Sequence, residues 1–474
     1  MVRENCGVVA AFSLSNENVI PLIIDCLRAL QHRGQEAWGI AIPNKTPYKE
    51  LGLVTESSNK FKEIIEKYRS NAAIGHVRYS TIGKSNLDNA QPLKVSDLCI
   101  AHNGTIANVE ELANMVGGCT FTPQNMNDTL LAAKKIVKLL NEKNDMNNAL
   151  KILKNDIIGS FSFTFVTDEN KIFAARDPKG FRPLVLGYHK ETETFVVASE
   201  SCAFLSIGAQ LIRDVKPGEL LKIDESGLDS QQFANEKHAH CAFEYTYFAH
   251  PTSIMEGINI YIARKSIGRA LAKKFPIKAD VVIPVPDSAR PAALGYAQEL
   301  GLEFEEGLLK DRYSKKGKLR SFIEPYQKDR EEIARWIIPI KEVINNKHVV
   351  VVDDSIVRGT SSIAIINAIR HAGAKRISMI VSYPAIRFPC YAGIDFPSRE
   401  ELIASNVEDI NGIDKAVAEV IKADFVGYND PDTLANAIGL PRDELCFTCS
   451  TGDYTNLGLI ERPIFKSRRE VKGE

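Results

Sequence analysis

The stretch Val349-Val350-Val351-Val352-Asp353-Asp354-Ser355-Ile356-Val357-Arg358-Gly359-Thr360-Ser361-Ser362 decides the fold of the second half of the chain. Four consecutive valines predict a strand that is buried on both faces, as in a parallel sheet. Two acidic residues follow the strand, and a loop rich in Gly, Ser and Thr then leads into a predicted helix. Adjacent carboxylates suit ribose hydroxyls and Mg²⁺, and backbone N–H groups at a helix N-terminus suit a monophosphate. A P-loop is excluded because the stretch lacks Gly-x-x-x-x-Gly-Lys-Ser/Thr.

The segments on either side of this stretch alternate between helix and strand. Apolar patterns predict helices over 258–275, 292–300 and 361–371, and strands over 281–285 and 377–382. Gly373 follows the last of these helices, as expected for a helix end. The alternation predicts an α/β domain with a parallel, doubly wound sheet.

The first half has a different pattern, made of short strands separated by Gly, Pro, Asp and Asn. Strands are expected at 6–12, 38–42, 72–76, 98–102, 160–167, 171–175, 183–186 and 195–199, and helices at 19–31 and 128–141. This predicts an α+β domain rich in antiparallel sheet. We place the boundary near 230–240, in the polar stretch 225–237. The predicted organisation is a segment 1–5, a domain 6–235, a domain 236–460 and a charged tail 461–474.

Composition narrows the class of protein. A chain of 474 residues with 44% hydrophobic residues supports two domains. Lys plus Arg is 59 and Asp plus Glu is 60, so the net charge of -1 argues against binding of nucleic acid through bulk charge. No apolar run is long enough to cross a membrane, and the first residues lack the apolar core of a secretory signal. The sequence therefore predicts a cytoplasmic protein with no membrane partner.

Cys6 leads the first predicted strand and is a candidate N-terminal nucleophile. In such enzymes the residue's own α-amino group, with a pKa of about 7.7–8.0, accepts the proton of the nucleophile. That arrangement requires cleavage between Asn5 and Cys6. Position alone favours the alternative, an ordinary cysteine buried in a strand.

Three further motifs decide between these alternatives. They are His32-Arg33-Gly34-Gln35-Glu36-Ala37-Trp38-Gly39-Ile40, His76-Val77-Arg78-Tyr79-Ser80-Thr81 and Ala101-His102-Asn103-Gly104. Together with Cys6 they resemble the class II glutamine amidotransferases, whose domain has the N-terminal-nucleophile (Ntn) hydrolase fold. The resemblance implies that Cys6 attacks the glutamine amide, and that Asn103 and the Gly104 N–H form the oxyanion hole. It also implies that Arg78 holds the glutamine carboxylate and Asp128 the α-amino group. Taken singly, these residues could form an ion pair, a turn and a helix cap.

The valine-rich stretch resembles the binding motif for phosphoribosyl pyrophosphate (PRPP) in type I phosphoribosyltransferases. A second stretch resembles the pyrophosphate loop of the same family: Pro284-Val285-Pro286-Asp287-Ser288-Ala289-Arg290-Pro291-Ala292-Ala293. The resemblance implies that Ser288, Asp353 and Asp354 surround Mg²⁺, which assists the departure of pyrophosphate. The full implied set of PRPP-binding residues is Asp287, Ser288, Asp353, Asp354, Ser355, Arg358, Gly359, Thr360 and Ser361.

Both motif sets together resemble the amidophosphoribosyltransferase family. The resemblance implies that glutamine is hydrolysed and that ammonia passes through an internal channel to C1 of PRPP. The products are 5-phosphoribosylamine, glutamate and pyrophosphate, in the first committed step of purine synthesis. It also implies a homotetramer that purine nucleotides inhibit. A sugar amidotransferase and a non-catalytic PRPP-binding regulator are the alternatives; Asp353-Asp354 argues against the first, and Cys6 with Asn103-Gly104 argues against the second.

Nine cysteines do not form a disulfide scaffold in a chain of this length. Cys241, Cys390, Cys446 and Cys449 fall where one branch of the family carries the ligands of a [4Fe–4S] cluster. Residue chemistry alone leaves Zn²⁺ open, because four thiolates also bind zinc and His238 and His240 lie nearby in the sequence. Cys26, Cys99, Cys119 and Cys202 are predicted to be core residues.

Three segments depart from the family pattern. His250-Pro251-Thr252 replaces the usual Arg-Pro-Asp and so removes a charge pair near the domain junction. The loop 310–323 is longer than its counterpart in the family, and we expect its extra lysines to be solvated. The run 335–339 is more apolar than the matching stretch of the family.

Overall fold

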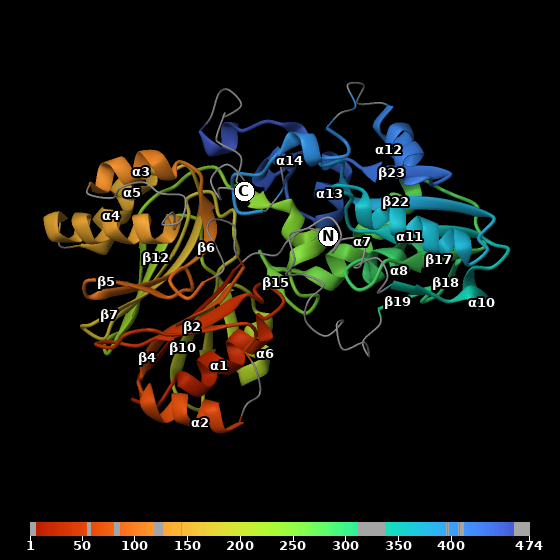
Figure 1. The fold of residues 1–474 in the computed structure, drawn as a ribbon. Coiled ribbons are helices and arrows are strands. Elements are labelled where there is room, and N and C mark those ends of the chain that lie inside the picture. Colours follow the sequence, from red (N-terminus) through yellow and green to blue (C-terminus); the bar gives the residue numbers. More distant parts are fainter. Residues whose placement is uncertain are drawn as a thin grey trace.

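The computed structural model describes residues 6–54, 58–79, 86–117, 127–143, 145–310, 337–394, 396, 398–405, 407 and 412–458. Figure 1 shows two lobes, an N-terminal lobe in red to yellow-green and a C-terminal lobe in green to blue, which meet beside the green helix α7 (Ile260–Lys274). Within the described residues, no helix is both long and apolar enough to cross a membrane.

The N-terminal lobe contains two antiparallel sheets. The first has the strand order β11-β9-β10-β1-β4-β2-β3 and the second the order β13-β12-β8-β7-β6-β5. The strands of the first sheet are β1 (Gly7–Ser13), β2 (Ala37–Ala41), β3 (Tyr48–Leu51), β4 (Ala72–Arg78), β9 (Val185–His189), β10 (Thr194–Ala198) and β11 (Gln210–Asp214). Those of the second are β5 (Leu93–Val95), β6 (Leu98–Ile106), β7 (Gly159–Thr167), β8 (Ile172–Arg176), β12 (Glu219–Asp224) and β13 (Gly227–Gln232).

Strand alternation explains how this lobe is layered. Val8, Ala10 and Phe12 of β1 pack into the core between the two sheets, whereas Val9 and Ala11 face the helices. Successive side chains of a strand point to opposite faces, so one sequence supplies both cores. Helices α1 (Ile20–Ala29), α2 (Ser58–Lys67) and α6 (Cys202–Ile207) cover the first sheet, and α3 (Val109–Val116), α4 (Asp128–Lys143) and α5 (Met146–Asp156) cover the second. The result is a four-layer α-β-β-α sandwich.

The C-terminal lobe is built on a parallel sheet with the order β18-β17-β21-β22-β23. Its strands are β17 (Val281–Pro284), β18 (Glu303–Phe304), β21 (His348–Asp353), β22 (Arg376–Pro384) and β23 (Phe425–Asn429). Val349 and Val351 of β21 face helices α11 (Thr360–His371) and α12 (Ile413–Ile421). Val350 and Val352 face α7, α8 (Arg290–Leu300) and α13 (Pro431–Ile438). Because helices cover both faces, the strand has no polar side, as the four valines predict.

Short elements join the lobes and close the C-terminal lobe. Strand β14 (His240–Cys241) pairs in parallel with β24 (Leu445–Cys446), so the start of the C-terminal lobe lies beside the end of the described chain. The π-helix η1 (Glu244–Phe248) follows β14. The remaining short elements are β15 (Ile254–Met255), β16 (Ile258–Asn259), β19 (Leu308–Lys310), β20 (Ile337–Pro339), α10 (Lys341–Ile344), α14 (Thr448–Thr451) and the 3₁₀-helices η2 (Arg399–Glu401), η4 (Arg442–Glu444) and η5 (Thr455–Leu457).

The predicted fold class is confirmed, and the differences are local. The helix predicted from Ile258 begins at Ile260, because Ile258 and Asn259 pair with β15 and the Asn259 side chain accepts the Ile262 N–H at 3.1 Å. The strand predicted at 183–186 lies at Val185–His189, where it pairs with β10 and β11. The polar stretch 225–237 begins inside the second sheet as strand β13, so only its last part connects the lobes. Residues 1–5, 311–323, 335–336 and 461–474 and Cys119 lie outside the described residues.

Candidate active sites

Cys6 lies immediately before β1, the central strand of the first sheet, and its side chain is buried. Its Sγ donates a hydrogen bond to the Tyr79 carbonyl at 3.3 Å. Burial raises the pKa of the Cys6 thiol to about 11, and the charges of Arg78 and Asp128 shift it in opposite directions. At neutral pH the side chain is therefore a thiol, and a base has to remove its proton before it can act as a nucleophile.

Arg78 and Asp128 lie close enough to Cys6 for their charges to change its pKa. Arg78 is the last residue of β4, which pairs with β1, and its side chain is buried. Asp128 begins α4, where it accepts the N–H groups of Thr129 at 2.8 Å and Ile106 at 3.1 Å. The cap of α4 comes from Asn127, whose Oδ1 accepts the Leu130 N–H at 3.2 Å. Asn127 and Asp128 therefore share the first N–H groups of α4, and Asp128 is not the sole cap of the helix.

Asn103 and Gly104 lie on β6, in the sheet facing Cys6. Asn103 is fully buried, its Nδ2 lies 3.3 Å from Ser199 Oγ, and among the described residues its Oδ1 has no hydrogen-bond partner. The Ser199 hydroxyl accepts the Val8 N–H at 2.9 Å, so its own proton is free to be donated. Gly104 packs so tightly that a Cβ would lie 2.2 Å from the Ser160 carbonyl oxygen, which explains the glycine. The pair is thus part of a fixed, buried strand and is not a solvent-exposed turn.

A buried set of charges at the junction of the lobes was not predicted. Arg33 Nε donates to the Cys6 carbonyl at 3.1 Å, its Nη1 pairs with Glu200, and its Nη2 lies 2.7 Å from Glu244 Oε1. Arg182 Nη2 lies 2.5 Å from the same Glu244 oxygen. We call Arg33, Arg182, Glu200 and Glu244 the junction network. It connects the backbone of Cys6 to η1 of the C-terminal lobe.

Glu200 is fully paired within the junction network. One oxygen accepts from Arg33 and from His32 at 2.9 Å, and the other accepts the His250 N–H and the Ser253 hydroxyl, both at 2.7 Å. Although burial acts in the opposite direction, these partners hold the pKa of Glu200 well below its usual range. The charge pair expected from the usual Arg-Pro-Asp is replaced by a hydrogen bond of 2.8 Å between the His250 and Thr252 side chains.

Asp353 and Asp354, here called the acidic pair, lie at the carboxyl end of β21 and are both buried. Asp354 accepts the Ser288 hydroxyl at 2.5 Å and the Ser355 hydroxyl at 2.6 Å, and its N–H bonds to Asp353 Oδ1 at 2.8 Å. Burial raises the pKa of both carboxyl groups, and for Asp353 the neighbouring Asp354 raises it further. The structure thus brings Ser288 to the acidic pair as expected, in an environment that favours an added cation.

The loop after the acidic pair delivers Thr360 and Ser361 to the first turn of α11. Gly359 precedes the helix with φ +80°, a backbone conformation that favours glycine. Arg358 donates to Glu401 at 2.6 Å. Thr360 and Ser361 begin α11, and N–H groups at a helix N-terminus suit an anion.

Asp287 lies after the Pro286–Asp287 peptide bond, which is cis. Its carboxylate is paired on both oxygens, with Arg290 at 2.5 Å and Lys310 at 2.7 Å. The Lys310 contact ties the predicted pyrophosphate loop to the first residue of the lengthened loop 310–323.

Arg264 of α7 lies between η1 and the acidic pair. It is buried and donates to the carbonyl groups of Tyr245 at 2.9 Å and of Tyr247 and Ala249 at 2.7 Å. Burial lowers its pKa to about 10, and the charge of Asp354 acts against that shift. Contacts of Arg33 with Glu244, and of Arg264 with the η1 backbone, therefore link the surroundings of Cys6 to those of Asp354.

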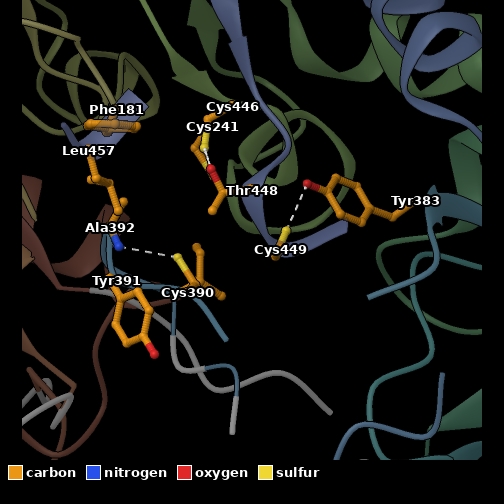
Figure 2. Close-up of a pocket in the computed structure, with 11 residues that line it drawn as sticks. Phe181, Cys241, Tyr383, Cys390, Tyr391, Ala392, Cys446, Thr448, Cys449 and Leu457 are labelled. Atoms are coloured by element: carbon orange, nitrogen blue, oxygen red, sulfur yellow. Dashed lines mark hydrogen bonds between the residues drawn. The ribbon is translucent and has the colours of Figure 1, made fainter. Parts of the chain in front are cut away.

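The four cysteines predicted to be cluster ligands line one pocket, although they come from positions 241 to 449. Figure 2 shows Cys241, Cys390, Cys446 and Cys449 arranged around a common space. Three of the sulfurs lie 3.3 Å from a polar group: the Ala392 N–H at Cys390, the Thr448 hydroxyl at Cys446 and the Tyr383 hydroxyl at Cys449. Burial raises the pKa of the Cys446 thiol to about 11. By contrast, Cys26, Cys99 and Cys202 are buried in the N-terminal lobe, as expected of core residues.

Family models match both lobes. A glutamine amidotransferase domain matches residues 76–206, and a phosphoribosyl transferase domain matches residues 253–408. Fold and sites therefore define a phosphoribosyltransferase joined to a class II glutamine amidotransferase.

Relatives of nearly the same length share both domains. The amidophosphoribosyltransferase of Archaeoglobus fulgidus is 41% identical over 463 residues, which cover 95% of this chain and 97% of that protein. The enzyme of the same name from Methanothermobacter thermautotrophicus is 38% identical over 465 residues, covering 96% and 95%. The solved structure of glutamine PRPP amidotransferase from Bacillus subtilis, complexed with ADP and GMP, matches with a TM-score of 0.81 and 36% identity, over 95% of this chain and 97% of that chain. The chain belongs to the amidophosphoribosyltransferase family.

Proposed function

We propose that this chain catalyses the amidophosphoribosyltransferase reaction. It hydrolyses glutamine at Cys6 and transfers the ammonia to C1 of PRPP, giving 5-phosphoribosylamine, glutamate and pyrophosphate. The observation that carries the proposal is the presence, in one chain, of a buried thiol beside Arg78 and Asp128 and of a buried acidic pair on a phosphoribosyltransferase loop. The proposed boundary between the two functional domains is at residues 235–236.

In the glutaminase site, removal of residues 1–5 would give Cys6 a free α-amino group. That amine would take the thiol proton, which burial otherwise holds with a pKa of about 11. The thiolate would attack the amide carbon and release ammonia, and water would then hydrolyse the thioester to glutamate. The Arg33 contact to the Cys6 carbonyl fixes the residue's backbone while its amine and sulfur react.

Asn103 and Gly104 would stabilise the oxyanion that forms on the amide oxygen. A 180° turn of the Asn103 amide lets its Oδ1 accept the free Ser199 proton and leaves its NH₂ group to donate to the oxyanion. A donor fixed in a buried strand needs little reorganisation during the reaction, and one such donor is worth about 10²–10³ in kcat. Arg78 would bind the glutamine carboxylate and Asp128 the α-amino group, since opposite charges attract strongly in a buried site.

In the transferase site, the carboxylate and hydroxyl oxygens of Asp353, Asp354 and Ser288 fit Mg²⁺, which prefers oxygen ligands. When bound, Mg²⁺ neutralises the pyrophosphate as it leaves C1 of the ribose. Thr360, Ser361 and the N-terminus of α11 would hold the 5-phosphate. The remaining members of the PRPP site are Asp287, Ser355, Arg358 and Gly359. The chain mainly positions PRPP for attack by ammonia.

The two reactions would be joined through the junction of the lobes. Phosphoribosylamine is labile and ammonia is lost to water, so passage inside the protein is expected to protect both. The route from Arg33 through Glu244 and η1 to Arg264 gives the two sites a physical connection.

Cys241, Cys390, Cys446 and Cys449 fit a [4Fe–4S] cluster, since four sulfurs surround one space and three have polar partners of the kind that tune such clusters. The cluster would be structural, clamping the last described segment to the start of the C-terminal lobe. Iron and acid-labile sulfide in anaerobically purified protein test this; bound zinc without sulfide would replace the proposal.

Regulation and assembly complete the proposal. The Bacillus subtilis structure was determined with ADP and GMP, and we propose that purine nucleotides inhibit this chain as well. We further propose a homotetramer.

The decisive experiment is a glutaminase assay with and without PRPP, combined with the intact mass of the purified protein. We expect loss of residues 1–5 and stimulation of glutamine hydrolysis by PRPP. A sugar amidotransferase would ignore PRPP, and a non-catalytic regulator would release no ammonia. Asn103→Ala should lower kcat about 100-fold or more, whereas Asn155→Ala, on the exposed end of α5, serves as the matched control.

A further inference from the structure

The β14–β24 ladder carries a second group of metal-ligand residues apart from the four cysteines. His238, His240 and Glu444 each place one ligand atom within 4.8 Å of the others. His240 pairs with Leu445 in the ladder, and Glu444 is the residue just before that strand. The rings of His238 and His240 lie 5.3 Å apart. The adjacent pair, Cys241 and Cys446, lines the cysteine pocket instead.

Neutral imidazole nitrogens and a carboxylate oxygen are the donors that Zn²⁺ takes in three-ligand sites with open positions. Tetrahedral ligands at 2.0–2.1 Å from zinc lie about 3.3 Å from one another. The ligand atoms of the observed group lie within 4.8 Å of one another, so binding requires rotation of His238 and Glu444, which are both only half-buried. Their partial exposure also gives an ion a path from solvent.

The surroundings of His240 are those of a metal ligand. His240 Nδ1 lies 2.9 Å from the Gly180 carbonyl, so it is the protonated nitrogen, and the lone pair is on Nε2. Such a hydrogen bond from the second ring nitrogen to a backbone carbonyl is the usual way in which proteins orient a histidine ligand. Arg176 lies close by, at 3.3 Å from Nδ1, but its charge is balanced by Glu256 at 2.8 Å.

His238 and Glu444 are also available as ligands. Within the described part of the chain, neither side chain makes a hydrogen bond or salt bridge. The two segments are paired by the β14–β24 ladder, and the residues just before His238 and Glu444, Lys237 and Asp443, form an exposed salt bridge of 2.8 Å.

The other such cluster, His32, Glu200 and Cys202, offers a useful contrast. There Glu200 is already paired with the guanidinium of Arg33. A fixed positive charge in that position takes the place of a cation, so the junction network excludes a metal.

We propose that His238, His240 and Glu444 form a zinc site that clamps residue 444 to the domain boundary beside the cysteine pocket. The site does not depend on the proposed catalytic activity. It makes the end of the described chain a doubly anchored segment, held through Glu444 and through Cys446 and Cys449.

The test uses the full chain, purified anaerobically, incubated with zinc sulfate and desalted. Zinc and iron are counted together, and X-ray absorption reports the ligands of zinc. We expect about one zinc per chain with nitrogen and oxygen ligands at about 2.0–2.1 Å. His238→Ala with Glu444→Gln should lose that zinc and keep its iron. His371→Ala, at an exposed histidine on α11, should keep both.

Three results would overturn the proposal: no zinc retained by the wild type, zinc retained by the double variant, or zinc bound by sulfur at about 2.3 Å. The last result would place zinc at the cysteines. If the double variant loses iron as well, Glu444→Gln alone decides the question, because it changes one half-buried oxygen and leaves both histidines in place. Zinc in that variant at the wild-type level would count against the site.

Discussion

Two buried pairs of carboxylates lie near the junction of the lobes, and the chain treats them in opposite ways. Glu200 and Glu244 are fully buried and paired with Arg33 and Arg182. Asp353 and Asp354 are almost as buried, but among the described residues their side chains accept hydrogen bonds from hydroxyl and N–H groups. The pKa of Glu200 is held well below its usual range, whereas burial raises those of the acidic pair.

The difference separates a structural charge cluster from a binding site. Buried carboxylates in ion pairs with arginine help to hold the fold together. Buried carboxylates without such an ion pair are typical of a site that binds a ligand. Removing a carboxylate from the first pair should therefore lower stability. Removing one from the second pair should lower activity and leave stability unchanged or higher.

The largest effect is expected for Glu200→Gln. Glutamine has one acceptor oxygen for the four N–H and O–H donors that Glu200 satisfies, and it leaves the charge of Arg33 incompletely paired. Breaking a buried pair of this kind costs about 3–5 kcal/mol. We expect a marked fall in the melting temperature of the N-terminal lobe, measured by calorimetry.

Glu219→Gln is the matched control for that variant. Glu219 is also buried, but its partner Arg213 is about one-third exposed and can turn to water. A loss of stability as large as that of Glu200→Gln would show that burial of the carboxylate, and not its pairing with a buried arginine, sets the effect.

The acidic pair should respond in the opposite way. Asp353→Asn removes repulsion from Asp354, so the melting temperature should stay the same or rise. PRPP-dependent formation of phosphoribosylamine from ammonia should fall about 100-fold or more, comparable to the loss of a main electrostatic contact at a reacting centre. Basal glutamine hydrolysis should persist, because Cys6 lies in the other lobe.

Asp432→Asn, at an exposed carboxylate on α13, is the control for this variant. Destabilisation of Asp353→Asn by several kcal/mol would contradict the distinction between the two pairs, since it would mean that the acidic pair also holds the fold together.

Local sequence pattern predicted the acidic pair but not the junction network. The four valines, the two aspartates and Gly359 are adjacent in sequence, so strand, site and helix start could all be inferred from one stretch. Arg33 lies 167 residues from Glu200 and 211 from Glu244, and no local period relates them. The β14–β24 ladder has only two residues on each strand, too few to show a strand pattern. Contacts of this kind depend on how the lobes pack and could not be predicted from propensity.

Acid should reduce the difference in stability between the wild type and Glu200→Gln. A glutamate has a pKa of about 4.3 in the unfolded chain, and that of Glu200 is lower in the folded chain. Its contribution to stability is therefore complete above about pH 5 and is lost as the pH falls through the folded pKa. We expect the difference in melting temperature between the two proteins to be constant from pH 8 to about pH 5 and to narrow below about pH 4.3. A difference that narrows between pH 8 and 6 would assign the effect to a histidine.

The smallest effect is expected at the edge of the junction network, where His250 and Thr252 replace the usual charge pair. Their side chains form one hydrogen bond of 2.8 Å, while Glu200 is held through the His250 backbone N–H, which any residue except proline supplies. Thr252→Asp should therefore change stability by less than about 1 kcal/mol, as is usual for an exposed charge, and the change should weaken at high salt. Melting temperatures at low and high salt measure this change. Thr192→Asp is not a suitable control, because the Thr192 side chain forms hydrogen bonds with His189 and Thr194. A salt-independent loss comparable to that of Glu200→Gln would mean that the side chains at 250 and 252, and not only the backbone, belong to the network that holds Cys6 in place.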